Sequence, residues 1–472
     1  MKKRVLKTVS LFLAVIMVLG LIGCGEKAEK NDGRRILKWE VLKAGYGSTA
    51  YEKIAEAFMA EHPDVLVKIN FNPDIANTTG SKLESNTNLS DVYSYRDIEA
   101  IKRWTANGYV EPLDALYETT LSTGKTIKES MIGNAAEVCS HNGTAYAIPE
   151  YTNVQGFVYN KSMFDEYGWK VPETTADLER LCKQILEDTD SQVAPITYCG
   201  GAAEGYLYFA ANQWTTQYEG ISQMDQFYKF ESPEVFNPSL YKGKMYALQN
   251  IQKFFYDEGN YTMTGSTGMT HIVAQSKIIQ GQAAMMLTGS WFETEMKEAL
   301  AAAPEKEFAM FPTPQLSDSR GEVLHSENYT TVDGKRVVEA SYGAYYFVPA
   351  NAPNKEDAIE FMKFLSEPSI CEMYTRYTNA VRPFDYELSA DAEVYKDMSA
   401  FGKSVLKFAD ENYLYSPNNS SPLAIKGLTG FWSRGRLPYI DLRDGVETVN
   451  QILQNEYDYA KNNWSSMLQM VE

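Results

Sequence analysis

The segment 36–71 has the pattern of a strand, a helix and a second strand, and this pattern constrains the fold more than any other feature. Apolar residues occupy every second position in 36–42 and again in 65–71, which predicts two strands. Between them, apolar residues at helical spacing predict a helix that begins at Thr49 and ends before His62-Pro63. Two strands joined in this way pair in parallel through a right-handed crossover. In such open sheets, ligands bind beyond the carboxyl ends of the strands.

Further helices are predicted where a capping residue precedes an apolar helical pattern. Thr49 and Glu52 have the spacing of a capping box, in which a hydroxyl and a carboxylate satisfy free amides of the first turn. Thr174 and Asn354 are expected to open two later helices. The C-terminal stretch is predicted to be helical from residue 441 to residue 472, with one apolar face made by Val446, Val449, Ile452 and Leu453. Because helices and strands alternate along the chain, the predicted fold class is α/β.

The first 24 residues have the features of an export signal. Four basic side chains lie within the first seven residues, and the apolar run 9–19 is short for a membrane span, which needs roughly 20 apolar residues. Leu21-Ile22-Gly23-Cys24 resembles the bacterial lipobox, whose cysteine is lipidated and becomes the new N-terminus. By that resemblance, residues 1–23 are a lipoprotein signal peptide, Cys24 carries the lipid anchor, and 24–33 is a flexible tether. A plain secretory signal is the alternative.

The mature chain is strongly acidic. Residues 1–23 hold four basic side chains and no acidic ones, so their removal moves the formal net charge from −18 to −22 over the remaining 449 residues. This charge disfavours nucleic acid as a partner, because phosphate binding depends on clustered Lys and Arg. The mature length fits two domains, and no second apolar segment is long enough to span a bilayer.

The four cysteines of the mature chain after Cys24 are widely spaced, and none belongs to a CxxC pair. They are therefore not expected to form a disulfide framework. Cys182 lies on the apolar face of the helix that Thr174 opens, so we predict a small core residue there. Pairing of Cys139 or Cys199 with another cysteine stays open.

Four segments share their order and separation with one known family. They are 142–174, which contains Pro149-Glu150-Tyr151, and then 281–291, 342–349 and 380–383. Together they resemble the extracellular solute-binding proteins of ABC importers, the group that includes maltose-binding protein. The resemblance extends over nearly the whole mature chain.

The resemblance implies a two-lobe, periplasmic-binding-protein-like fold of class II, with a hinge and a ligand cleft between the lobes. It places the N-terminal lobe at 34–149 plus 342–384, and the C-terminal lobe at 150–341 plus 385–472. Pro149-Glu150-Tyr151 would then cross between the lobes and face the cleft. Each lobe is discontinuous in sequence because the chain crosses more than once.

Two segments depart from the pattern of the better-known relatives. Segment 200–265 is rich in aromatic and polar residues and matches no pattern. Segment 315–340 resembles an insertion and contains a predicted hairpin at 330–338, because Asp333-Gly334 suits a tight type I′ turn. We expect this hairpin to be a surface decoration. Either segment could reshape the cleft.

The composition suits a carbohydrate ligand. Aromatic residues make up 13% of the chain, and their rings offer flat apolar surface that matches the C–H faces of pyranose rings. Carboxylates, amides and arginine supply directional hydrogen bonds, which are stronger when charge-assisted. Gly289-Ser290-Trp291 matches the family's Gly-x-Trp motif, in which the tryptophan is a stacking platform. Trp291 is therefore the first candidate for ligand binding, with a core tryptophan at a helix start as the alternative.

Other candidates come from the crossing segment and from the predicted binding edge of the sheet. Glu150 and Tyr151 match the crossing segment that contacts ligand in relatives, although solvated hinge residues would have the same sequence. The residues after the strand that begins at Asp91 lie at the binding edge, unless they form a plain surface loop. Weaker candidates lie in the loop after the first strand, in the fourth segment and near the C-terminus, and Trp214 is expected in the core with a second stacking surface as the alternative. These edge and weaker candidates are Tyr95, Arg96, Asp97, Tyr46, Arg382 and Trp432.

Enzyme classes find little support in the sequence. The four histidines form no HExxH motif, and no G-x-S-x-G elbow is present. A glycoside hydrolase needs two carboxylates at a defined separation, and with 62 acidic residues in the chain this class stays an alternative. A surface lipoprotein that binds peptide or polysaccharide as an adhesin is the other alternative.

The resemblance therefore implies a receptor without enzymatic activity, cofactor or metal ion. It would sit as a monomer on the extracytoplasmic face of the bacterial cell membrane, held by lipidated Cys24. There it would capture a carbohydrate, most simply an oligosaccharide, and deliver it to the permease subunits of an ABC transporter.

Overall fold

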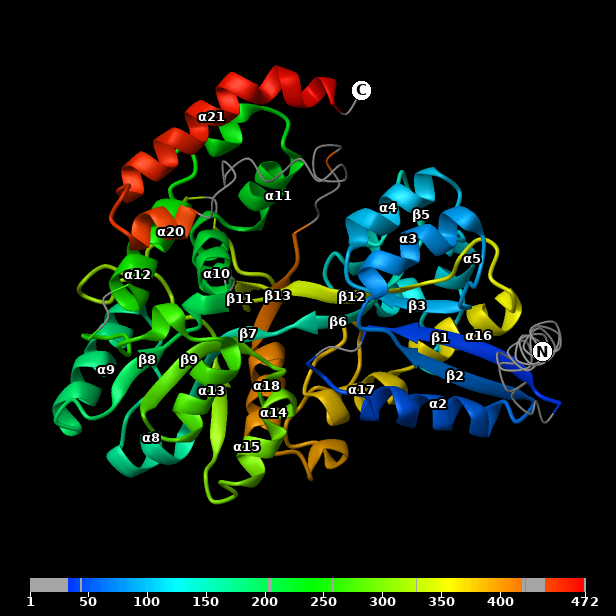
Figure 1. Cartoon of the computed structure of the whole chain (residues 1–472), viewed down its shortest axis with the longest axis horizontal. Coiled ribbons are helices and arrows are strands. Elements are labelled where there is room, and N and C mark those ends of the chain that lie inside the picture. The colour runs from blue at the N-terminus through cyan, green and yellow to red at the C-terminus, as the bar shows by residue number, and fades with distance from the viewer. Residues whose placement is uncertain are drawn as a thin grey trace, which may run out of the picture.

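The chain forms two lobes, each built around its own β-sheet (Figure 1). This structure is a computed structural model that describes residues 33–42, 45–202, 206–256, 259–327, 329–417, 421 and 438–470. The predicted signal peptide, Cys24 and Trp432 lie outside the described residues. The predicted α/β class and two-lobe fold are confirmed.

The first lobe contains a five-stranded sheet in the order β2-β1-β3-β12-β6. β1 pairs in parallel with β2 and β3, while β12 is antiparallel to β3 and β6. The predicted strand, helix and strand are confirmed as β1, α2 and β2. The strands are β1 (Arg35–Val41), β2 (Val65–Phe71), β3 (Val92–Tyr95), β6 (Ile148–Asn153) and β12 (Ser341–Phe347), with a small β4–β5 pair (Ser140–His141, Thr144–Ala145) beside them. The helices are α2 (Thr49–Glu61), α3 (Ile75–Ser85), α4 (Ile98–Ala106), α5 (Asp114–Tyr117), α6 (Ile127–Ser130), α7 (Ala135–Val138), α16 (Lys355–Leu365) and α17 (Pro368–Thr378).

The second lobe contains a four-stranded sheet in the order β10-β7-β9-β8, with helices on both of its faces (Figure 1). β8 and β9 are parallel, and β7 is antiparallel to β9 and β10. The strands are β7 (Gln155–Asn160), β8 (Ala194–Thr197), β9 (Ala283–Gly289) and β10 (Phe308–Phe311). The helices are α8 (Lys161–Tyr167), α9 (Thr175–Asp188), α10 (Leu207–Glu219), α11 (Ile221–Lys229), α12 (Gly243–Phe255), α13 (His271–Ile279), α14 (Phe292–Glu295), α15 (Lys297–Ala301), α18 (Ala400–Glu411), α20 (Pro438–Arg443) and α21 (Val449–Gln469). Short 3-10 turns also occur, among them η2 (Pro233–Phe236) and η3 (Ser266–Gly268).

Each lobe has an apolar core of its own. In the first, Trp39 of β1 is fully buried and packs edge-on against Tyr51 of α2 and Phe361 of α16. In the second, Trp214 and Cys182 are both fully buried in one cluster, as predicted. Two separate cores allow the lobes to move as rigid bodies relative to each other.

The chain passes between the two lobes at Val154, again at Ala340, and a third time after α17. β6 stays in the first sheet through Asn153, so the first crossing lies four residues beyond the boundary expected after residue 149. The backbone amide of Thr152 donates to the carbonyl of Val381 at 2.8 Å, which links the first and third crossing segments. The crossings therefore lie together and form a hinge.

Two of the predicted helix starts differ from the structure in their caps. The capping box of Thr174 and Asp177 at α9 is present in full. The Thr49 and Glu52 box is wrong: the N-cap of α2 is Ser48, one residue before Thr49, and no side chain caps this helix start. The Glu52 amide already donates to the Ser48 carbonyl at 3.1 Å, so no free amide remains there for Thr49. Asn354 precedes α16, but its side chain instead donates to the carbonyl of Ile36 at 2.9 Å.

The predicted turn at Asp333-Gly334 is present, with positive φ at both residues. The hairpin is limited to the antiparallel bridge between Val332 and Lys335 that closes this turn, and the expectation that both arms lie at the surface is wrong. Its second arm forms β11 (Arg336–Glu339), which pairs in parallel with β13 (Asn412–Tyr415) instead of folding back on residues 330–331. Val337 and Val338 are buried, and this pairing across the fold explains why the arm stays in the interior.

Near the C-terminus, the structure has two helices, α20 and α21, rather than one. Val446 lies between them and is 61% exposed, whereas Val449, Ile452 and Leu453 are buried as predicted. The segment between the two helices contains Gly445, which has a φ of 67° that helices do not use. The four cysteines of the described residues are buried and carry no disulfide. Among the helices that the structure describes, none combines the length and the hydrophobicity needed to cross a membrane.

Candidate functional site

The two lobes meet at the loop that follows β1. The hydroxyl of Tyr46 lies 2.8 Å from the Ser290 hydroxyl of the second lobe, and both side chains are buried. The Tyr46 ring packs edge-on against Tyr151 at 4.9 Å. Burial raises the pKa of Tyr46 well above its usual value, so the phenol stays protonated and can donate a hydrogen bond. Two of the predicted site residues, Tyr46 and Tyr151, are thus brought together at the junction.

Trp291 follows Ser290 directly and occupies the N-cap position of α14. Its ring folds back over Gly289, where any Cβ would lie 2.1 Å from the Cζ3 atom of the tryptophan. This close approach is the physical reason for the glycine in the Gly-x-Trp motif. A Cβ on Gly45 of the first lobe would lie 3.3 Å from the Trp291 Cβ, so the tryptophan also contacts the opposite lobe. Trp291 is therefore an interlobe residue rather than a core tryptophan.

Two further rings from the start of α10 surround Trp291. Tyr206 and Phe209 pack edge-on against it, at centroid distances of 5.9 and 5.7 Å. All three rings are partly exposed. The second lobe therefore presents an aromatic cluster, formed by Tyr206, Phe209 and Trp291, at the point where it faces the first lobe.

A hollow of about 540 Å³ lies at the carboxyl ends of β1 and β3, between α3 and α4. Tyr95, Arg96 and Asp97 all line it, together with Trp104 of α4. Arg96 and Asp97 are exposed, whereas Tyr95 is buried and packs against Trp104 at 5.0 Å. The edge-of-sheet prediction thus placed these three residues at a real concavity that has both an aromatic wall and charged groups.

Asp97 also has a structural role in this hollow. Its Oδ1 atom accepts a hydrogen bond from the Ala100 amide at 3.0 Å, which caps α4. Arg103 lies 3.6 Å from the other carboxylate oxygen. The carboxylate is thereby held in one orientation, with about half of its side chain still exposed to solvent.

Glu150 is fully buried in the hinge and is not open to a ligand in this conformation. Its carboxylate accepts hydrogen bonds from the hydroxyls of Tyr51 at 2.6 Å, Tyr374 at 3.3 Å, and Ser94. Burial raises the pKa of Glu150, and the hydrogen bonds from the three donors partly offset this rise. The expectation that Glu150 contacts ligand directly finds no support here, because its oxygens are already occupied by protein donors.

Arg382 is likewise a hinge residue, with 1% of its surface exposed. Its Nε atom donates to the Glu150 carbonyl at 2.7 Å, and its Nη2 atom donates to the Pro149 carbonyl at 3.4 Å. The guanidinium also faces the rings of Tyr346 and Phe384. Direct contact with a ligand is again unsupported, because Arg382 instead ties the first crossing segment to the third.

The structure adds residues that sequence reasoning missed. Glu295 of α14 accepts a hydrogen bond from Gln275 Nε2 at 2.6 Å and lies 3.5 Å from the His271 ring. Ser290 belongs to the Gly289-Ser290-Trp291 motif, so the sequence already pointed to its neighbourhood. Tyr206 and Phe209 lie in segment 200–265, whose sequence carries no pattern that would point to the junction. In the part of the chain that the structure describes, no group of three His, Cys, Asp or Glu side chains could hold a metal ion.

A comparison with known families decides which class of protein carries this geometry. The sequence model of the family of bacterial extracellular solute-binding proteins matches residues 43–370 of this chain. The chain belongs to this family. The resemblance inferred from the four sequence segments is confirmed.

Among curated proteins, this solute-binding protein is similar to the melibiose/raffinose/stachyose-binding protein MelE of Bacillus subtilis. The two are 22% identical over 399 residues, which cover 82% of this chain and 86% of the relative. The multiple sugar-binding protein of Streptococcus mutans is 23% identical over 309 residues, covering 64% and 69% of the two chains. Among solved structures, RafE of Streptococcus pneumoniae in its apo form shares the fold, with a TM-score of 0.65, 16% identity and coverage of 92% and 99%.

Proposed function

We propose that this solute-binding protein captures a carbohydrate, most simply an oligosaccharide, between its lobes and delivers it to the permease of an ABC importer. The observation that carries the proposal is the aromatic cluster of Tyr206, Phe209 and Trp291 beside the Tyr46–Ser290 contact. The similarity to relatives whose names specify sugars supports the same ligand class.

The chemistry of the junction suits a sugar. Partly exposed rings can pack against the C–H face of a pyranose, and hydroxyl groups of the protein can both donate and accept hydrogen bonds with sugar hydroxyls. Ligand contacts to both lobes would stabilise the closed state relative to the open one, which couples binding to closure.

The hollow beside α4 supports a ligand longer than one sugar. It lies on the first lobe, and it offers the Trp104 ring together with the exposed charges of Arg96 and Asp97. Hydrogen bonds from ionised side chains are shorter and stronger than neutral ones. In this proposal, one part of the ligand packs on Trp291 and another extends toward this hollow.

The remaining parts of the proposal concern the context of the receptor. It would be a monomer held at the extracytoplasmic face of the membrane by lipidated Cys24, and it would release its ligand unchanged. Incubation with oligosaccharides should therefore yield no shorter products, and their appearance would favour a glycoside hydrolase instead.

Trp291→Ala tests the proposed site. Aromatic contacts contribute roughly 1 kcal/mol beyond area burial, so oligosaccharide affinity should fall by at least about fivefold. A calorimetric titration with a panel of oligosaccharides measures the dissociation constants. Tyr459→Ala is the matched control, because that ring is 38% exposed on α21 and takes no part in the site. An unchanged constant for Trp291→Ala would remove the tryptophan from the ligand site.

A further inference from the structure

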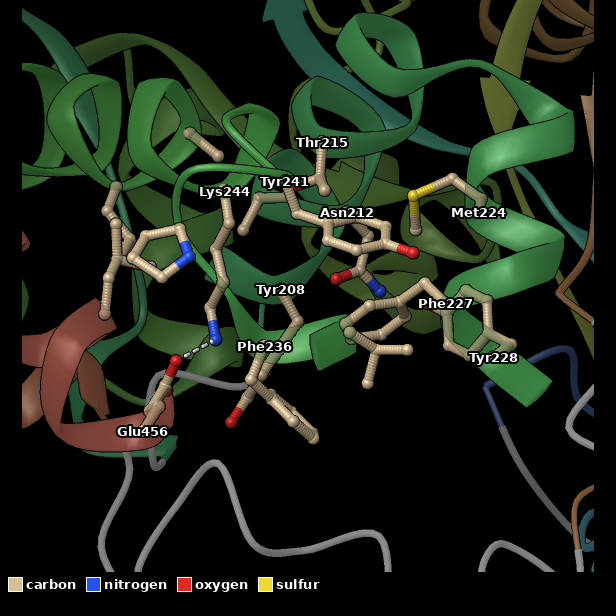
Figure 2. A pocket seen from close by; sticks show the side chains of 16 residues that line it. Tyr208, Asn212, Thr215, Met224, Phe227, Tyr228, Phe236, Tyr241, Lys244 and Glu456 are labelled. Carbon is tan, nitrogen blue, oxygen red and sulfur yellow. Dashed lines mark hydrogen bonds and ion pairs between the residues drawn. The ribbon is translucent and has the colours of Figure 1, made fainter. Parts of the chain in front are cut away.

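We propose that the second lobe carries a separate binding site for a small, neutral, hydroxylated ring. A cavity of about 180 Å³ lies among α10, α11, α12 and α21, and Figure 2 shows the side chains from these helices that line it. All of the lining residues that the structure describes belong to the second lobe. The proposal concerns a site distinct from the junction of the lobes.

The walls of the cavity are mostly apolar, and five of the described lining residues carry aromatic rings. Phe227 of α11 packs edge-on against Phe236 at 5.8 Å and against Tyr241 at 5.7 Å, and Tyr208 and Tyr228 complete the set of rings. An apolar cavity of about 150 Å³ in another protein is large enough to bind benzene. The cavity is therefore the right size for one six-membered ring, and its rings offer flat or edge-on contacts to it.

One wall is polar. Lys244 Nζ lies 2.5 Å from the carboxylate of Glu456, which is only 2% exposed, and Figure 2 shows this pair facing the cavity. The pair is electrically neutral as a whole, so an ionic ligand would have to displace one of its partners. A hydroxyl group fits without displacement, because it can donate to the carboxylate and accept from the ammonium. A predominantly apolar lining with a few convergent polar groups is typical of small-molecule sites.

Helix α10 separates this cavity from the junction of the lobes. The start of the helix places Tyr206 and Phe209 against Trp291, whereas Tyr208, Ala211 and Thr215 line the cavity. Since none of the described first-lobe residues lines the cavity, occupancy does not require closure of the lobes. The same hydroxylated-ring chemistry occurs in a pyranose unit and in a phenol, and the first source would extend the proposed carbohydrate function.

Saturation-transfer NMR on the mature chain tests the site with two probes, methyl β-glucopyranoside and phenol. Ala211→Met fills the cavity from α10, and filling a void tends to preserve or raise stability. Ser222→Met is the matched control, because Ser222 is exposed on neighbouring α11 and does not line the cavity. We expect at least tenfold weaker binding of the probe in Ala211→Met, with no change in Ser222→Met or Trp291→Ala. Thr215→Leu fills the same cavity one turn later and replaces Ala211→Met if that variant does not fold.

The outcomes separate this site from the proposed function. Binding of only phenol or only the glycoside identifies the source of the ring. Absence of binding for both probes, or binding that survives filling of the cavity, overturns the proposal. Loss of probe binding in Trp291→Ala would also overturn it, because the probe would then occupy the junction. The proposed function fails independently, if oligosaccharides do not bind to the wild-type chain.

Discussion

Among single residues, burial divides the predicted ligand-binding residues into two groups. Trp291 and Asp97 keep surface that a ligand can reach, whereas Glu150 and Arg382 have almost none. A charged side chain in the interior must be compensated by hydrogen bonds, and both hinge residues find such partners in the protein. Hydrogen bonds within the hinge therefore hold both side chains and link the crossing segments.

Glu339 is a second buried carboxyl, and it predicts a measurable pH dependence. It accepts a hydrogen bond from the Thr216 hydroxyl, and burial raises its pKa to about 7. Because the folded state holds this proton more tightly than the unfolded state, its contribution to stability is present below about pH 4.5 and is lost as pH rises through 7. Glu339→Gln should remove this loss, which amounts to roughly 3 kcal/mol at most. Urea unfolding of both proteins, repeated at intervals of about one pH unit between pH 5 and 8, measures the difference in their free energies of unfolding.

The control for this experiment is Glu322→Gln, because Glu322 is exposed. Its free energy of unfolding should follow that of the wild type at every pH. If Glu339→Gln also keeps the wild-type pH profile, then the carboxyl of Glu339 does not titrate with a raised pKa.

Among the helices, the contrast between two N-termini can be tested directly. Thr174 accepts a hydrogen bond from the Asp177 amide at 3.1 Å at the start of α9, so Thr174→Ala should lower the free energy of unfolding by about 1 kcal/mol. Thr49 lies inside the first turn of α2 and makes no cap, so Thr49→Ala should change it by less than about 0.5 kcal/mol. Chemical denaturation of both variants measures these values. Equal losses would mean that Thr49 caps α2 in solution.

For the molecule as a whole, the contact between the lobes predicts how closure can be blocked. Small-angle scattering should show a smaller radius of gyration when an oligosaccharide is added, because the hinge allows the lobes to close on it. In Gly45→Val, the added side chain would meet Trp291, so compaction should be reduced and affinity weakened. Gly268→Val is the control, since a Cβ at that position meets no atom of the described residues within 4 Å. Full compaction of Gly45→Val would show that the lobes do not close through this contact.

Local features of this protein were readable from short stretches of sequence. The alternation in β1 and β2, the capping box at Thr174 and the Gly-x-Trp motif each depend on residues a few positions apart. The order of four such segments was enough to identify the family and hence the two lobes. Such features are local because backbone periodicity and steric fit act between near neighbours in the chain.

Other features of the fold and of the candidate site depend on packing between residues that are far apart in the sequence. The pairing of β11 with β13 joins residues about 75 positions apart, and the burial of Glu150 and Arg382 depends on three crossing segments meeting in one hinge. The second-lobe cavity combines helices from a segment without a recognisable pattern with the distant helix α21. Whether a side chain is exposed, paired or facing a cavity depends on which distant elements pack beside it, and that information is not carried by the spacing of its neighbours in sequence.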